Sequence, residues 1–164
     1  MYTTLLWATD GSPEADLALS EALELLAPRG RLVAFHCDQR FWRDRAAGVP
    51  VLADEFDHRR HIEEQVDELR AAGIDAVVDI EVAEHGTPRE IAAVAAHAGA
   101  DAIVCGTRGL GGPFGLLTGS VAADLLRLAT VPVIVVPART ARQVAPATTG
   151  RRARHVATHA AFIG

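Results

Sequence analysis

Residues 101–137 read "DAIVCGTRGLGGPFGLLTGSVAADLLRLATVPVIVVP". The apolar runs at 101–106 and 131–137 are typical of buried strands, and residues 120–130 between them are typical of a short helix. Two strands joined through a helix form a parallel pair. The loop at 106–120 holds six glycines, one proline and no lysine. Its bare backbone can approach a ligand closely, at the end of a strand.

The same alternation of strand and helix extends over the preceding hundred residues. Strands are expected at 3–10, 31–37 and 75–82, and helices at 13–26, 54–72 and 87–100. Ser12 and Pro13 favour the start of the first helix, and we expect Pro28 and Gly30 to end it. Apolar strands alternating with helices predict an α/β fold, a Rossmann-like doubly wound sheet of five parallel strands with helices on both faces. Ligands of such sheets bind beyond the carboxyl ends of the strands.

The charge of the chain divides it into two parts. Residues 1–137 carry all 21 acidic residues and 11 of the 16 arginines, a net charge of −10, whereas residues 138–164 carry five arginines and no acidic residue. We therefore expect one domain at 1–137 and a basic C-terminal tail at 138–164, either flexible or docked on the acidic body or on an acidic partner. The acidic body argues against a general nucleic-acid-binding domain.

The remaining composition indicates a cytoplasmic protein. The start of the chain has no basic leader and no long apolar run, and no segment is apolar for the length of a membrane span. Cys37 and Cys105 are too few for a disulfide framework or a zinc ligand set. We expect reduced, buried thiols.

Three familiar motifs do not fit the glycine-rich loop. It lacks the lysine of a Walker loop, the third glycine of a dinucleotide fingerprint and the paired glycines of a nucleophile elbow. A helix that opens at Gly119 and Ser120 would still attract an anion through its free amides, and Gly106 and Gly109 would let backbone wrap around it. The alternative is a flexible glycine loop without a ligand.

The spacing of these residues is that of a known signature. Gly106, Gly109, Gly119 and Ser120 form the pattern G-x2-G-x9-G-[ST], which resembles the ATP-binding signature of the universal stress protein family. The stretches "WATDGS" at 7–12, "ADAIVCGTRG" at 100–109 and "GSVAADLLRLATVPVIVVP" at 119–137 resemble the same family. The resemblance covers residues 2–137 and implies that the domain at 1–137 is a nucleotide-binding domain.

The resemblance implies a sheet of order 3-2-1-4-5 with ATP at the strand ends, and it leaves dependence on Mg²⁺ open. Backbone amides of the loop and the Ser120 hydroxyl would hold the phosphates, and Asp10 would lie near the ribose or a phosphate-bound metal. The backbone of Cys37 would meet the adenine, where valine is common in the family. Arg108 lies inside the loop and could face phosphate. The site residues implied are Asp10, Cys37, Gly106, Arg108, Gly109, Gly119 and Ser120.

The resemblance also implies a dimer paired through the last strand. The edge strand Val131–Val136 is apolar on both faces, which independently favours pairing with a second copy. We expect an ATP-dependent stress-response regulator with an unknown protein partner. Two alternatives remain: a dimeric interaction module without nucleotide, and a slow ATP hydrolase with Asp10 as its single good catalytic candidate.

Two histidines suggest a further site. His58 and His61 are three residues apart on the expected helix 54–72, followed by Glu64 and Gln65. Two histidines and an acid can contribute to a zinc site, but a fourth ligand is not evident. We expect a solvated helix face instead.

Overall fold

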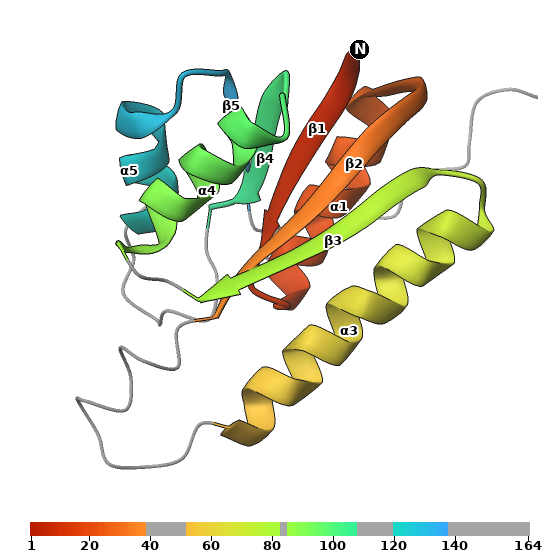
Figure 1. Cartoon of the computed structure of the whole chain (residues 1–164), viewed down its shortest axis with the longest axis horizontal. Coiled ribbons are helices and arrows are strands. Elements are labelled where there is room, and N and C mark those ends of the chain that lie inside the picture. The colour runs from red at the N-terminus through yellow and green to blue at the C-terminus, as the bar shows by residue number, and fades with distance from the viewer. Residues whose placement is uncertain (39–51, 83–84, 108–119, 138–164) are drawn as a thin grey trace, which may run out of the picture.

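The computed structural model of the chain describes residues 1–38, 52–82, 85–107 and 120–137, drawn in colour in Figure 1. Strands and helices alternate along the described residues. In chain order they are β1 (Tyr2–Thr9), α1 (Pro13–Leu25), β2 (Leu26–Asp38), α3 (Leu52–Ala71), β3 (Asp75–Val82), α4 (Thr87–His97), β4 (Ala102–Gly106), α5 (Ser120–Leu128) and β5 (Val133–Val136).

The strands form one parallel sheet of order β3-β2-β1-β4-β5. This confirms the expected doubly wound fold and its order. The chain starts in the middle of the sheet, builds β2 and β3 on one side and then crosses to build β4 and β5 on the other. The reversal lies between β1 and β4, and the carboxyl ends of all strands meet at one edge.

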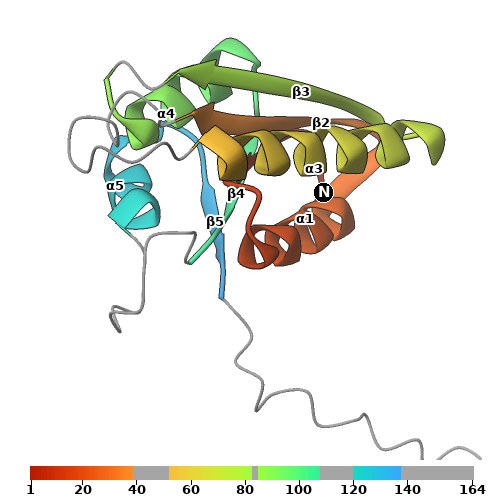
Figure 2. The same ribbon diagram turned by 90° about the horizontal axis from the view of Figure 1, so that it is seen from below.

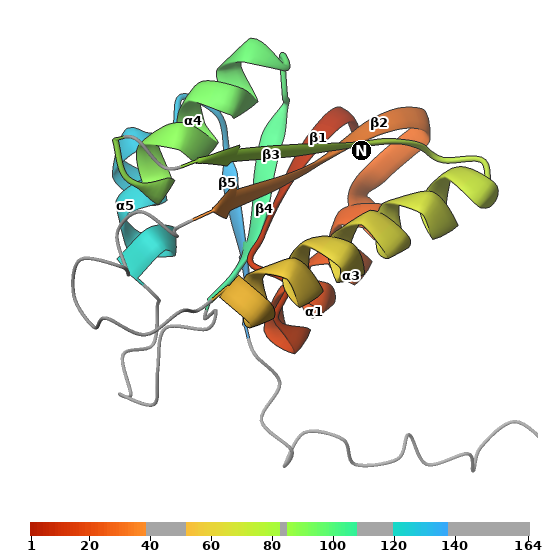
Figure 3. The ribbon, with the colours of Figure 1, turned by 60° about the horizontal axis from the view of Figure 1, so that its bottom comes forward.

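Alternate side chains of each strand enter two separate cores. Leu5 and Trp7 of β1 pack with residues of α1 and α3, whereas Leu6 and Ala8 pack with residues of α4 and α5. Figures 2 and 3 show these helix pairs on opposite faces of the sheet. The period of two along β1 places apolar side chains on both faces, which explains why its sequence is a continuous apolar run.

The prediction that Pro28 and Gly30 end the first helix is wrong. Helix α1 already ends at Leu25, and Leu26 has extended backbone (ψ 136°) and pairs with β1. A proline disfavours helical backbone only at the residue before it, Ala27, whereas the helix ends two residues earlier. Pro28 and Gly30 lie in β2 where its register with β1 shifts, and Arg29 between them has φ 65°.

The last strand lies at the edge of the sheet beside β4, as expected, although it is shorter than predicted. It spans Val133–Val136, and its neighbours Val131 and Pro132 precede the strand. The two cysteines are free and buried on β2 and β4, with β1 between them. The expectation of reduced, unpaired thiols is therefore confirmed.

The described helices are all too short or too polar to cross a lipid bilayer. The predicted basic tail at 138–164 lies outside the described residues.

Candidate functional site

Four of the seven predicted site residues lie among the described residues. Asp10, Cys37 and Gly106 stand at or just beyond the carboxyl ends of β1, β2 and β4, and Ser120 is the first residue of α5. Thr9 is in register with His36, and Ala8 with Cys105, so Asp10 is level with Cys37. Adjacent strands therefore bring these positions to one edge, at the switch point.

The other three predicted residues, Arg108, Gly109 and Gly119, lie outside the described residues. Their place at the site stays a prediction. The described chain enters this segment from β4 through Thr107, whose N–H donates to the carbonyl of Val136 (2.8 Å).

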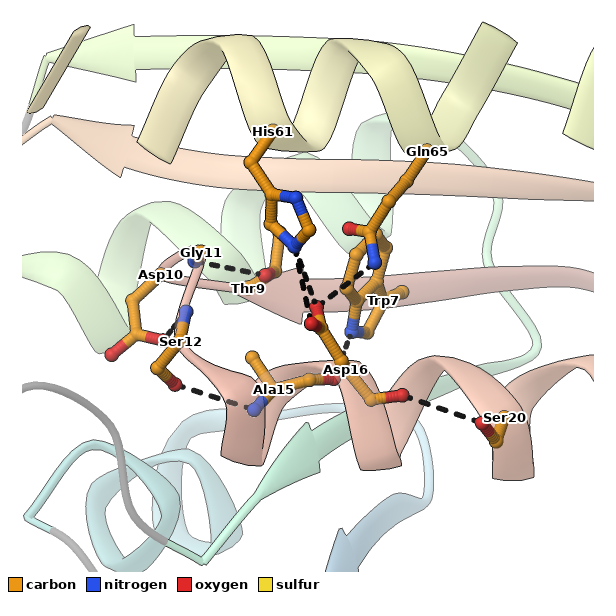
Figure 4. A network of polar contacts seen from close by, with 10 residues as sticks. All are labelled: Trp7, Thr9, Asp10, Gly11, Ser12, Ala15, Asp16, Ser20, His61 and Gln65. Carbon is orange, nitrogen blue, oxygen red and sulfur yellow. Dashed lines mark hydrogen bonds and ion pairs between the residues drawn. The ribbon is translucent and has the colours of Figure 1, made fainter. Parts of the chain in front are cut away.

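The turn from β1 into α1 is held by its own side chains (Figure 4). Thr9 Oγ1 accepts from the Gly11 N–H (3.1 Å), and Asp10 Oδ1 accepts from the Ser12 N–H (3.1 Å). Ser12 is the N-cap of α1, and its hydroxyl accepts from the Ala15 N–H (3.3 Å). Ser12 therefore caps the helix, and Asp10 braces the turn with one carboxylate oxygen.

Gly11 is the residue that allows this turn to be tight. Its φ is 75°, which L-residues other than glycine rarely adopt, and a Cβ built there would lie 2.8 Å from the Cβ of His58 on α3. The backbone of the turn thus lies directly against α3. The Asp-Gly pair after a strand is the sequence signal for this conformation.

The side chain of Cys37 is turned away from the ligand edge into the core covered by α4 and α5. Burial raises the pKa of its thiol to about 11, partly offset by a side-chain hydrogen bond with Thr87, while Glu90 and other carboxylates act in the same direction as burial. Burial raises the pKa of Cys105 to about 11 as well. Both thiols are protonated at neutral pH, so neither is an activated nucleophile. What Cys37 offers a ligand at the edge is its backbone.

The start of α5 differs electrostatically from the starts of α1 and α4. Its first turn has no acidic side chain, whereas Glu14 and Asp16 lie in the first turn of α1 and Glu90 in that of α4. Ser120 at this start is exposed. The positive end of the α5 dipole is therefore not neutralised by its own side chains, which favours an anion there.

The zinc alternative finds no support in the described residues, where no cluster of three or more His, Cys, Asp or Glu residues could hold a metal. The expected solvated face is also wrong in part, because His58 contacts Gly11 and His61 Nε2 lies 3.1 Å from Asp16 Oδ2. Gln65 donates to the same carboxylate (3.0 Å). This face of α3 packs on α1 and on the turn from β1 into α1 (Asp10–Ser12).

Sequence reasoning missed the pairing of His36 with Glu55. The Nε2 of His36 lies 2.7 Å from Glu55 Oε1, and its Nδ1 lies 3.0 Å from the carbonyl oxygen of Thr9. His36 is buried near the end of β2. No local pattern links it to a residue nineteen positions away.

Comparison with known proteins places this arrangement in a family. The model of the universal stress protein family matches residues 1–137. The chain belongs to the universal stress protein family. No curated protein matches the chain.

Solved structures share the fold. The chain is similar to a hypothetical protein, MJ0577 (23% identity, TM-score 0.73, covering 85% of this chain and 99% of that one). It is also similar to a universal stress family protein from Burkholderia pseudomallei (28% identity, TM-score 0.59, covering 84% and 97%). A third relative is a universal stress protein in complex with cAMP (26% identity, TM-score 0.56, covering 82% and 96%).

Proposed function

We propose that this chain binds an adenine nucleotide, ATP in the first place, at the carboxyl ends of β1, β2 and β4, and regulates a stress response according to its occupancy. One observation carries the proposal. Gly106, the first residue of the family signature, ends β4 beside the end of β1, where Asp10 follows, and this is the switch point of the sheet. A related universal stress protein is in complex with cAMP, which supports an adenine ligand.

The described residues are suited to the parts of such a nucleotide. The backbone at Cys37 would meet the adenine, and the exposed acid-free start of α5 at Ser120 would meet phosphate. Asp10 would lie near the ribose or a phosphate-bound Mg²⁺. Gly106 would admit the phosphates from the β4 side, and Arg108, Gly109 and Gly119 would complete the loop around them.

We further propose that the protein is a cytoplasmic homodimer paired through Val131–Val136. Support comes from the position of β5 at the sheet edge, with three of its four residues only partly buried. An unsatisfied strand edge of this kind pairs readily with a second copy. The unidentified protein partner would read the nucleotide-dependent shape of the site.

Calorimetric titration of nucleotide-free protein tests the proposal. ATP, AMP and cAMP are compared, each with and without Mg²⁺. We expect saturable binding of one ATP per chain. Folded protein that binds none of the three would overturn the proposal and favour the nucleotide-free interaction module. Linear release of ADP that is lost in Asp10→Ala would instead assign a slow hydrolase.

A charge placed at the start of α5 tests where the phosphates lie. Ser120→Glu should leave the fold intact, because an acidic residue suits a helix N-terminus, while it repels a bound triphosphate. The matched control is Ser20→Glu, which adds the same charge at an exposed position of α1. We expect Ser120→Glu to weaken ATP binding at least about tenfold, which corresponds to about 1.4 kcal/mol, and the control to bind like wild type.

A further inference from the structure

One face of α3 makes three contacts around the turn from β1 into α1, residues Asp10–Ser12. Glu55 reaches the end of β1 through His36, His58 lies against Gly11, and His61 and Gln65 bind the first turn of α1 through Asp16 (Figure 4 shows the last contacts). The residues of α3 involved follow one another at three to four positions, which is one face of a helix. Behind them Ile62 and Val66 are buried in the core.

The ion pair of His36 with Glu55, which reaches Thr9 just before the turn, is more deeply buried than that of His61 with Asp16. The His36 side chain is 4% exposed and that of Glu55 is 16% exposed. His36 bonds the carbonyl of Thr9, and the hydroxyl of Thr9 in turn accepts from the Gly11 N–H. A displacement of His36 would therefore be passed to the backbone from which the turn departs.

Both ring nitrogens of His36 face oxygen atoms that act as acceptors. The Thr9 carbonyl can only accept, so Nδ1 must carry a hydrogen. An ionised Glu55 carboxylate also only accepts, so Nε2 must carry one too. The pair thus holds one proton more than a neutral imidazole beside a carboxylate, either as an imidazolium or with the proton on Glu55. Without that proton a ring nitrogen would face an oxygen, lone pair to lone pair.

Among the described residues, three further titratable groups stand next in sequence or by a helical turn to the residues of this contact. Asp38 lies two residues further along β2 on the same face, and Asp10 follows Thr9 at the end of β1. From β3, the uncharged Ile80 is in register with His36. His58 lies one turn along α3 from Glu55.

We infer that the protonated His36–Glu55 pair is a positioning device, which fixes the Asp10–Ser12 turn on α3 so that its affinity for ligand depends on pH. Loss of the proton breaks the bridge, frees the Thr9 carbonyl and loosens the turn. The effect on affinity rests on the proposed function; the effect on the turn does not.

The variant Glu55→Gln separates a proton-dependent bridge from a merely structural one. The glutamine amide can donate to an unprotonated Nε2 while Nδ1–H still donates to Thr9, so the bridge no longer needs the extra proton. The turn should then stay in place at high pH. His97→Asn is the matched control, because it removes an exposed histidine at the far end of α4.

The first measurement is independent of nucleotide. Nitrogen-15 NMR of the His36 ring and of the Gly11 amide follows a titration from about pH 6 to about pH 9, which spans the ordinary histidine value of about 6.5. We expect wild type and His97→Asn to lose a ring proton with a matching shift of the Gly11 amide, and Glu55→Gln to show a nearly constant Gly11 amide. Two results would overturn the inference. One is a His36 ring with an unprotonated nitrogen at the lowest pH, and the other is a pH-dependent shift of the Gly11 amide that is as large in Glu55→Gln as in wild type.

The second measurement is ATP affinity over the same pH range. We expect wild type to lose about tenfold more affinity than Glu55→Gln, which corresponds to about 1.4 kcal/mol and is at the lower end for a charge-assisted hydrogen bond. Protonation of ATP itself affects all variants alike. Equal losses in wild type and Glu55→Gln would refute the coupling to affinity. If ATP binds at no pH while the Gly11 amide follows the pair, the proposed function fails and the positioning device stands.

Discussion

Replacing Gly11 with alanine should cost far more stability than the same replacement at Gly73. Both glycines have positive φ, 75° and 85°. An added Cβ at Gly73 would meet nothing within 4 Å, whereas at Gly11 it would lie 2.8 Å from the Cβ and 3.1 Å from the Cα of His58. The pair of variants therefore separates backbone strain from the contact between the turn and α3.

The magnitudes follow from these two contributions. Positive φ costs an L-residue about 1–2 kcal/mol, and the lower entropy of the unfolded alanine variant returns about 0.4–1 kcal/mol. Gly73→Ala should therefore lose about 1 kcal/mol. Gly11→Ala also forces backbone apart, because the Cα of His58 cannot rotate away, and overpacking of this kind costs about 1–3 kcal/mol. Its total loss should be about 2–4 kcal/mol.

Urea denaturation followed by circular dichroism measures both losses. We expect a lower midpoint for Gly11→Ala at an unchanged slope, and a small shift for Gly73→Ala. Equal losses in the two variants would show that α3 does not press on the turn. That result would also mean that packing against His58 does not hold the turn in place.

Three further outcomes are expected. Asp101 accepts from the N–H and hydroxyl of Thr3 and from the N–H of Thr4, and these bonds lower the pKa of its carboxyl from the ordinary 3.8. The stability that the ionised carboxylate adds is therefore present above pH 3.8 and is lost as the pH falls through the lowered pKa. Asp101→Asn should reduce this loss in acid-denaturation curves. Trp7 donates its indole N–H to the carbonyl of Ala15 (3.0 Å), which lies inside α1 and keeps its helical partner, so Trp7→Phe should cost about 0.5–1.5 kcal/mol in urea denaturation from the lost hydrogen bond. Burial raises the pKa of both thiols from 9.0 to about 11, so the stability that the protonated thiols add is complete below pH 9 and is lost as the pH rises through about 11. Because the thiols are buried and protonated, a thiol reagent at neutral pH should label the native protein much more slowly than the urea-unfolded protein.

The sequence by itself determined which segments form strands and helices, and the edge of the sheet at which we propose that the ligand binds. The apolar runs that became β1 and β4 and the Ser12-Pro13 start of α1 are local signals, because strand and helix periods are set by neighbouring residues. The family signature added the order of the strands. The end of α1 was misjudged, because Leu26 leaves the helix to pair with Tyr2, a residue distant in sequence.

Only the tertiary structure decided which groups meet around the turn from β1 into α1. His36 and Glu55 are 19 residues apart, and Asp16 and His61 are 45 apart, and nothing in either neighbourhood indicates the other. Such pairs depend on how helices cross the sheet, which is a property of packing over long sequence separations. The alternation of residues predicts that α3 covers the sheet. The packing of α3 decides that His58 lies against Gly11 and that His61 meets Asp16 of α1.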